Sequence, residues 1–96
     1  MNYLVFDIGG TAIKYALMTE SSHIIEKGEI STPKLNFEDF IEKLLSIYYK
    51  FNNIEGIALS LPGKIDSITG FSYSGGSLFY NNEKNIPKFL SSKLGI

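Results

Sequence analysis

Apolar and polar residues alternate in the first third of the chain in a way that predicts β-structure. Tyr3 to Phe6 is a short apolar run rich in strand-forming residues, and Ala12 to Met18 places every second side chain on one face. A polar turn separates these residues from a third run, His23 to Ile30. The stretch Gly9 to Thr11 joins the first two runs, as expected of a hairpin. We therefore predict three antiparallel strands in a meander.

The period of the pattern changes after Pro33, where a helix is predicted. Asn36 is suited to cap this helix, because its side chain can accept a hydrogen bond from a backbone N–H of the first turn. Asn52 and Asn53 are expected to end it. A strand reached through a helix is usually parallel to an earlier one, so the apolar run Ile54 to Leu61 should pair with Tyr3 to Asp7. The helix positions expected to face the core are Phe37, Phe40, Ile41, Leu44, Leu45 and Tyr48.

The remaining part of the chain combines turns with one short helix. The stretch "KIDSITGFSY", residues 64 to 73, is expected to form a hairpin that turns at Ser67 to Gly70, and Ser74 to Asn82 is expected to be irregular. Asn85 can cap a last helix, which Gly95 would end in a left-handed conformation. The apolar positions of that helix are Ile86, Phe89, Leu90 and Leu94.

Length, charge and composition limit the number of domains, the partners to be expected and the kinds of metal site. A chain of 96 residues forms one domain at most, and a formal net charge of -1 gives no electrostatic reason to expect nucleic acid or an anionic membrane as a partner. There is no cysteine, so disulfides and thiolate metal sites are excluded. No apolar run approaches the roughly 18 residues of a membrane span, and a cytoplasmic location is expected. The only histidine, His23, is expected in a surface turn.

Candidate chemistry is concentrated in the stretch "FDIGGTAIKYALMT", residues 6 to 19. Glycines at 9 and 10 would let phosphate oxygens approach backbone N–H groups, and the Thr11 hydroxyl could add a donor. Asp7 could hold a hydrated magnesium ion, and Lys14 could add positive charge. An ordinary glycine hairpin, with the aspartate stabilising its own turn, is the alternative interpretation. The glycine patterns of P-loop and dinucleotide-binding folds are absent.

Three sequence blocks, in order, resemble the ROK family (repressor, open reading frame, kinase). They are "FDIGGTAIKYALM", "GIALSLPGKIDSITG" and "NIPKFLSSKLGI", and together they cover most of the chain. The loop "SGGSLFYNN" is most similar to that of the β-glucoside kinases and related hexose kinases. The resemblance implies an α/β fold, namely a ribonuclease-H-like (actin-like ATPase) lobe. It would have three antiparallel strands, a crossover helix and a parallel strand, with residues 1–96 forming a partial amino-terminal lobe.

The resemblance also implies roles for individual residues. The expected contacts to the ATP phosphates and Mg²⁺ are Asp7, Gly9, Gly10, Thr11 and Lys14, and the expected border of the sugar cleft is Pro62, Gly63, Ser74, Gly75 and Gly76. A strand stop is the alternative for Pro62-Gly63, and a flexible loop is the alternative for Gly75-Gly76. In the family, the general base is an aspartate on the strand that follows the last helix, and here it is expected beyond Ile96.

An ATP-dependent kinase for a hexose or β-glucoside is therefore the expected function of the parent protein, with this chain alone inactive. A NagC-like, sugar-responsive transcriptional regulator of the same family, or a non-catalytic binding module, is the alternative. The meander and crossover predict the strand order third, second, first, then Ile54 to Leu61. That last strand would be an open edge, and we expect it to be covered by self-association, by strand exchange or by the chain's own carboxy-terminal segment.

Overall fold

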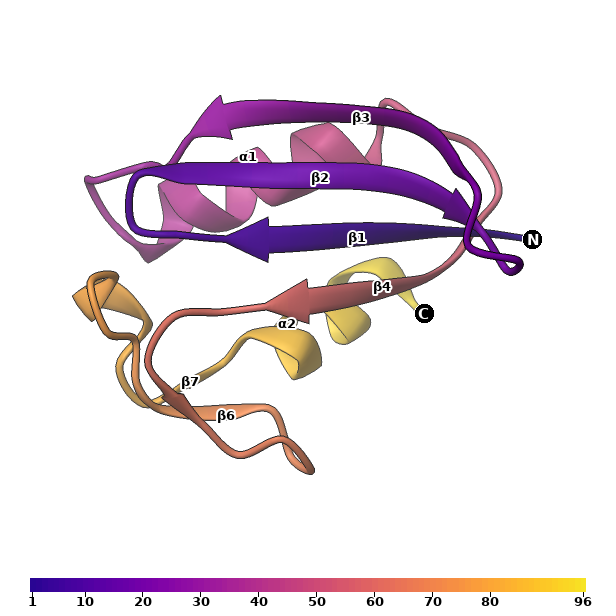
Figure 1. Cartoon of the computed structure of the whole chain (residues 1–96). Coiled ribbons are helices and arrows are strands. Elements are labelled where there is room, and N and C mark those ends of the chain that lie inside the picture. The colour runs from indigo at the N-terminus through magenta and orange to yellow at the C-terminus, as the bar shows by residue number, and fades with distance from the viewer.

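A mixed four-stranded sheet in the order β3-β2-β1-β4 forms the centre of the structure (Figure 1). The computed structural model describes every residue from Met1 to Ile96. β1 pairs antiparallel with β2 and parallel with β4, and β2 pairs antiparallel with β3. This order confirms the predicted meander and crossover, and it leaves β4 at one edge. The strands are β1 (Asn2–Ile8), β2 (Ala12–Thr19), β3 (Ile24–Ser31) and β4 (Ile54–Ser60).

The crossover between β1 and β4 is completed by helix α1 (Phe37–Tyr48). Asn36 caps it as predicted, since its side-chain oxygen accepts a hydrogen bond from the Asp39 N–H at 2.8 Å. The predicted end at Asn52 and Asn53 was wrong, because the helix already ends at Tyr48. A turn follows instead, in which Asn53 takes a left-handed φ of 59° and directs the chain into β4.

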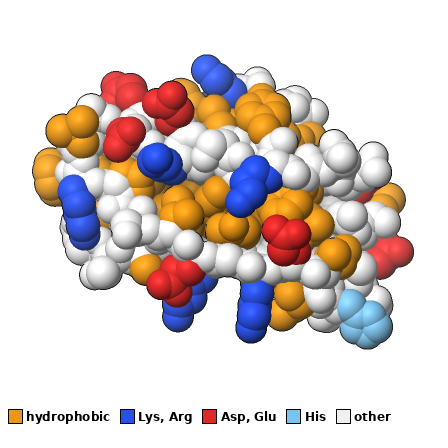
Figure 2. All heavy atoms as spheres, turned by 90° about the horizontal axis from the view of Figure 1, so that it is seen from above, with side chains coloured by type: hydrophobic (Ala, Val, Ile, Leu, Met, Phe, Trp, Pro, Cys, Tyr) orange, Lys and Arg blue, Asp and Glu red, His pale blue; other side chains and the backbone are white.

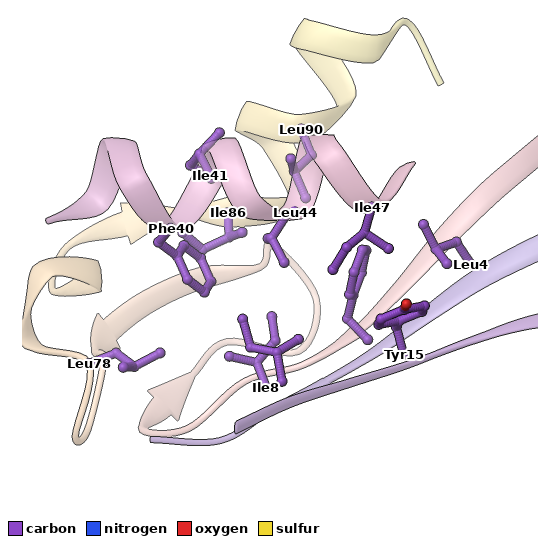
Figure 3. Packing of buried hydrophobic residues seen from close by; sticks show 12 residues of the cluster. Leu4, Ile8, Tyr15, Phe40, Ile41, Leu44, Ile47, Leu78, Ile86 and Leu90 are labelled. Atoms are coloured by element: carbon purple, nitrogen blue, oxygen red, sulfur yellow. The ribbon is translucent and has the colours of Figure 1, made fainter. Parts of the chain in front are cut away.

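The core lies between one face of the sheet and the two helices, as Figure 3 shows. Leu4, Ile8 and Tyr15 project from β1 and β2 toward α1, and Leu78 and Leu90 complete the cluster from later segments. The predicted helix face needs one correction. Ile47 is buried although it was not predicted, whereas Phe37, Leu45 and Tyr48 lie at the margins and are only partly buried. The buried residues of α1 are Phe40, Ile41, Leu44 and Ile47.

After β4, the chain forms a small second sheet of order β5-β6-β7. The predicted hairpin is confirmed, because β5 and β6 pair antiparallel. In its turn, the Asp66 side chain accepts hydrogen bonds from the N–H groups of Ile68 and Thr69. These bonds lower the pKa of Asp66, and the bond from the Ile68 N–H has the larger effect. The stretch expected to be irregular contains a one-turn helix, and β7 was not predicted. These elements are β5 (Lys64–Ile65), β6 (Phe71–Ser74), η1 (Phe79–Asn81) and β7 (Lys84–Asn85).

Helix α2 (Ile86–Leu94) closes the structure and begins and ends as predicted. The Asn85 side chain accepts a hydrogen bond from the Lys88 N–H at 3.0 Å, and Gly95 has a left-handed φ of 73°. Of its apolar positions, Ile86 and Leu90 are buried, whereas Phe89 lies outside the core. It is 41% exposed, and its ring meets the edge of Phe37 at a centroid distance of 5.4 Å.

The opposite face of the sheet carries no helix. Alternation along β1 and β2 directs Tyr3, Val5 and Ala16 to this face, where they are half-buried, together with the exposed Asp7 and Lys14. The side of the molecule drawn in Figure 2, which is seen from above relative to Figure 1, carries charged side chains of both signs with apolar atoms between them. His23, in the turn between β2 and β3, is exposed, which confirms the predicted surface position. No helix is long and apolar enough to cross a membrane.

Candidate phosphate-binding site

The connection between β1 and β2 is a tight hairpin that its own backbone closes. The Gly9 N–H donates to the Ala12 carbonyl oxygen at 3.0 Å. The N–H groups of Gly10 and Thr11 have no acceptor within the chain. Gly10 is half-buried and Thr11 is exposed, so the tip presents two adjacent backbone donors. Such a pair, with glycine removing the Cβ that would block access, is suited to bind an anion.

The carbonyl oxygens of the same tip are all held by one segment that follows β3. We call this segment, Thr32 to Lys34, the strap. The Thr32 hydroxyl donates to the Gly9 carbonyl at 2.8 Å, and the Thr32 N–H donates to the Thr11 carbonyl at 3.0 Å. The Lys34 ammonium donates to the Gly10 carbonyl. The acceptors of the hairpin are therefore occupied, while two of its donors are free.

Beside the tip, polar residues form a row across the uncovered face of the sheet. Asp7 pairs with Lys14 on β2 and with Ser60 on β4, and Lys14 pairs in turn with Glu29 on β3. All four side chains are exposed. A carboxylate and an ammonium thus lie on adjacent strands, next to the hairpin that joins them. This places Asp7, Gly9, Gly10, Thr11 and Lys14, all predicted from the sequence, at one end of the sheet.

The residues predicted to border a sugar cleft form a second cluster, and two loops build it. Gly63 has a φ of 104°, and a Cβ at this position would meet the Ser74 carbonyl oxygen and would lie 2.7 Å from the Gly76 nitrogen. Gly76 has a φ of 60°, and a Cβ there would lie 3.0 Å from the Gly63 nitrogen, a less severe approach. The loop after β4 and the loop after β6 are therefore packed backbone against backbone.

The N–H groups of the second glycine pair are occupied, unlike those of the hairpin. The Gly75 N–H donates to the Asn82 side chain at 2.7 Å, and the Gly76 N–H donates to the Ser74 hydroxyl at 3.1 Å. Gly75 is buried, and a Cβ there would lie 2.9 Å from that of Asn81. The loop is held in place by these contacts, so its glycines serve close packing of the backbone.

The hairpin contacts the residue that directly follows the second cluster, Ser77. A Cβ on Gly10 would collide with the Ser77 side chain, whose own Cβ lies 3.0 Å away. The hairpin and the segment that leads into η1 accordingly lie at the same end of the molecule (Figure 1). Sequence reasoning missed Thr32, Lys34 and Ser77, which all come from loops. The only signal that could have suggested Thr32 was its position directly after the third strand, opposite the hairpin.

Comparison with known proteins gives the class and then the family. No family model matches the chain. It is 39% identical over 80 residues to a glucokinase of Halalkalibacterium halodurans, covering 74% of this chain and 24% of that protein. It is 29% identical over 96 residues to a β-glucoside kinase of Klebsiella pneumoniae, covering 100% of this chain and 32% of that protein. The chain thus spans about a quarter to a third of the length of the curated relatives it matches.

Solved structures agree on the fold. A Streptococcus pneumoniae ROK family protein in complex with sucrose matches with a TM-score of 0.80 and 35% identity, over 96% of this chain and 31% of that one. A Streptomyces griseus ROK family glucokinase in complex with glucose and AMPPNP has a TM-score of 0.86 at 15% identity, over 100% of this chain and 31% of that one. At that identity the likeness shows the fold alone.

The four-stranded mixed sheet with its crossover helix and glycine hairpin is that of the actin-like ATPase lobe. Within this class, the chain belongs to the ROK family. A ROK family transcriptional regulator, described as a homologue of the Escherichia coli MLC protein, also matches, with a TM-score of 0.72 at 19% identity over 99% of this chain and 26% of that one. The fold therefore does not separate kinases from regulators. The curated relatives, which are sugar kinases, favour the kinase interpretation.

Proposed function

We propose that residues 1–96 form part of the amino-terminal lobe of an ATP-dependent sugar kinase, which transfers the γ-phosphoryl group to a hydroxyl of a hexose or β-glucoside. One observation carries the proposal. The hairpin tip has its carbonyl groups occupied and two adjacent N–H groups free, beside an exposed carboxylate. The match to a Halalkalibacterium halodurans glucokinase supports a sugar as the acceptor.

The donor set of the hairpin fits a nucleotide triphosphate with Mg²⁺. The N–H groups of Gly10 and Thr11, with the Thr11 hydroxyl, would donate to phosphate oxygens, and Gly9 would keep the turn closed. Asp7 would hold the hydrated Mg²⁺, a hard cation that prefers oxygen ligands. Lys14 and Lys34 would add positive charge. Phosphoryl transfer depends mainly on positioning and on electrostatic stabilisation, and these residues could supply both.

The sugar side of the site is proposed on Pro62, Gly63, Ser74, Gly75 and Gly76. Because the N–H groups of the two loop glycines are occupied, these glycines would shape the cleft by packing. The exposed Ser74 hydroxyl accepts from the Gly76 N–H, and its own proton would be available to a sugar. No general base is assigned within the chain, so we expect the chain alone to phosphorylate no sugar. ATP-dependent formation of a sugar phosphate by the pure chain would contradict this. Because ATP is the proposed phosphoryl donor, we propose a cytoplasmic location.

Titration of the isolated chain with Mg²⁺-AMPPNP, followed by amide NMR, tests the phosphate site. The Gly10 and Thr11 resonances should shift more than any others. Asp7→Asn should weaken nucleotide binding. In this variant, the dissociation constant should be the same with and without Mg²⁺. Glu55→Gln is the matched control. Glu55 is also an exposed carboxylate, but it lies near the start of β4, whereas Asp7 pairs with Ser60 at the end of that strand. Unshifted Gly10 and Thr11 resonances at millimolar nucleotide would refute the proposal.

A second copy of this chain is the partner we propose for the free edge of β4. This strand pairs only with β1, and its sequence, Ile54 to Ser60, contains a single charge, Glu55. An apolar groove of about 360 Å³ runs between β4 and α2 next to the edge, and Ile57, Leu59 and Leu90 contribute to its lining. Unpaired edges with few charges are templates for strand pairing. Sedimentation should show a concentration-dependent dimer, and a strict monomer together with fast hydrogen exchange along β4 would contradict it.

A further inference from the structure

The strap is fixed more firmly than a surface loop would be. Thr32 is 3% exposed and Pro33 is buried. The Tyr80 hydroxyl donates to the Pro33 carbonyl at 2.7 Å, and the Tyr80 ring packs against Phe40 of the core at a centroid distance of 5.5 Å. Burial raises the pKa of Tyr80 to about 12, with a smaller contribution from the Asp39 carboxylate, so its hydroxyl remains a donor at neutral pH. The strap is thereby tied to the core.

Peptide geometry connects the strap to the two free donors of the hairpin. The carbonyl of one residue and the N–H of the next belong to the same planar peptide unit, and in the trans form they point in opposite directions. The Gly9 carbonyl, held by the Thr32 hydroxyl, therefore sets the direction of the Gly10 N–H. The Gly10 carbonyl, held by Lys34, sets the direction of the Thr11 N–H in the same way.

The hairpin needs such a restraint because it contains two consecutive glycines. Glycine populates both halves of φ space with similar ease, so an unrestrained Gly9-Gly10 peptide could rotate and turn a carbonyl toward a bound anion. A rotated peptide would present a negative partial charge where the phosphate oxygens should lie. The two N–H groups without an acceptor are those whose peptide units are fixed by strap side chains.

We infer that Thr32 is a positioning residue for the phosphate-binding hairpin, through the bond from its hydroxyl to the Gly9 carbonyl. Lys34 performs the same task on the next peptide unit and also brings a positive charge. This inference rests on the proposed function, since it takes the bound anion to be a phosphate. Thr32 gives the cleaner test, because its replacement changes no charge.

The experiment compares Thr32→Val, which removes the hydroxyl but keeps the branched shape, with Thr32→Ser, which keeps the hydroxyl. Thr19→Val is the matched control, because the Thr19 side chain accepts a hydrogen bond from the His23 N–H at the opposite end of β2. Amide NMR of the chain, with Mg²⁺-AMPPNP as the probe, measures the dissociation constant at Gly10 and Thr11. Loss of one such hydrogen bond should weaken binding about three- to tenfold in Thr32→Val, and Thr32→Ser and Thr19→Val should stay within about twofold of the original chain.

Hydrogen exchange without nucleotide separates failure of this inference from failure of the proposed function. The Gly9 N–H, which closes the hairpin onto Ala12, should exchange faster in Thr32→Val than in Thr19→Val. If the unmodified chain does not bind AMPPNP, the proposed function fails, and the exchange comparison still decides the role of Thr32. Equal exchange rates in the two variants, or a Thr32→Ser chain that binds as weakly as Thr32→Val, would overturn the inference. If Thr32→Val fails to fold, the unmodified chain still provides a test. Its Thr32 hydroxyl proton should exchange slowly, because it is hydrogen-bonded to the Gly9 carbonyl, and rapid exchange of this proton would overturn the inference.

Discussion

Replacement of Gly63 by alanine tests the contact between the two loops that build the proposed sugar side. The new Cβ would collide with the Ser74 carbonyl oxygen and would lie 2.7 Å from the Gly76 nitrogen and 2.8 Å from the Gly75 carbonyl carbon. All three atoms are backbone, so none can move aside by a side-chain rotation. The φ of 104° at Gly63 is also unfavourable for any residue with a Cβ.

The expected cost combines these two effects. An unfavourable backbone conformation costs about 1–3 kcal/mol, and overpacking costs about 1–3 kcal/mol, so the free energy of unfolding should fall by about 2–6 kcal/mol. A domain of this length has a total stability of about 5–14 kcal/mol. Gly63→Ala should therefore remove a large part of it.

Two other glycines provide controls within the same chain. Gly95 has a φ of 73° but nothing within 4 Å of its Cβ position, so Gly95→Ala isolates the conformational cost, about 1–2 kcal/mol. Gly56 has no positive φ, and its Cβ position lies 3.3 Å from the Tyr3 ring, so Gly56→Ala should change stability by less than about 1 kcal/mol. Urea denaturation followed by circular dichroism ranks the three variants. A Gly63→Ala chain no less stable than Gly95→Ala would refute the packing of the two loops.

Three further predictions concern the site, the core and the strap. In a sugar kinase that contains this chain, Asp7→Ala should lower kcat about 100-fold and leave the KM for sugar nearly unchanged. If a coupled assay gives a normal kcat, Asp7 only stabilises the turn. Ile47→Ala should lower the free energy of unfolding by about 2–5 kcal/mol in urea denaturation, and Leu45→Ala, at the margin of the core, by clearly less. The pKa of Tyr80 is raised from 10.0 to about 12, so its contribution to stability is complete below pH 10 and is lost as the pH rises toward 12. Tyr80→Phe should remove that loss from thermal melts recorded between these pH values, and an unchanged profile would contradict the assignment.

Local patterns were sufficient to predict the sheet and both helix caps. The meander follows from alternation, and the parallel pairing of β4 follows from the handedness and length of a helical crossover. Asn36 and Asn85 were identifiable because a cap involves only neighbours in sequence. The end of α1 was not predicted, because the apolar residues Tyr49 and Phe51 continue the helical pattern while the backbone already turns.

The candidate site was predictable only where its residues are contiguous. The hairpin residues from Asp7 to Lys14 form one stretch of sequence, and the structure keeps them together. The contacts of Thr32 and Lys34 with that hairpin span more than 20 residues of chain, and no local pattern encodes them. Gly63 and Gly76 are closer in sequence, on either side of the β5-β6 hairpin, and sequence reasoning named these glycines but not the contact between them.

The pairing of β4 with β1 has a consequence for the order of folding. β1 and β2 pair across a short hairpin, whereas Asn2 meets Ile54 across more than half of the chain. Closing the long loop costs more chain entropy and delays the contacts that depend on it. The meander should therefore form first, with the glycine hairpin already in it, and β4 should dock later. Gly63 can meet Ser74 and Gly76 locally, across the β5-β6 hairpin, but the contact of Ser77 with Gly10 joins distant parts of the chain. The proposed sugar side would therefore join the phosphate hairpin late, and it would separate from it early in native-state hydrogen exchange.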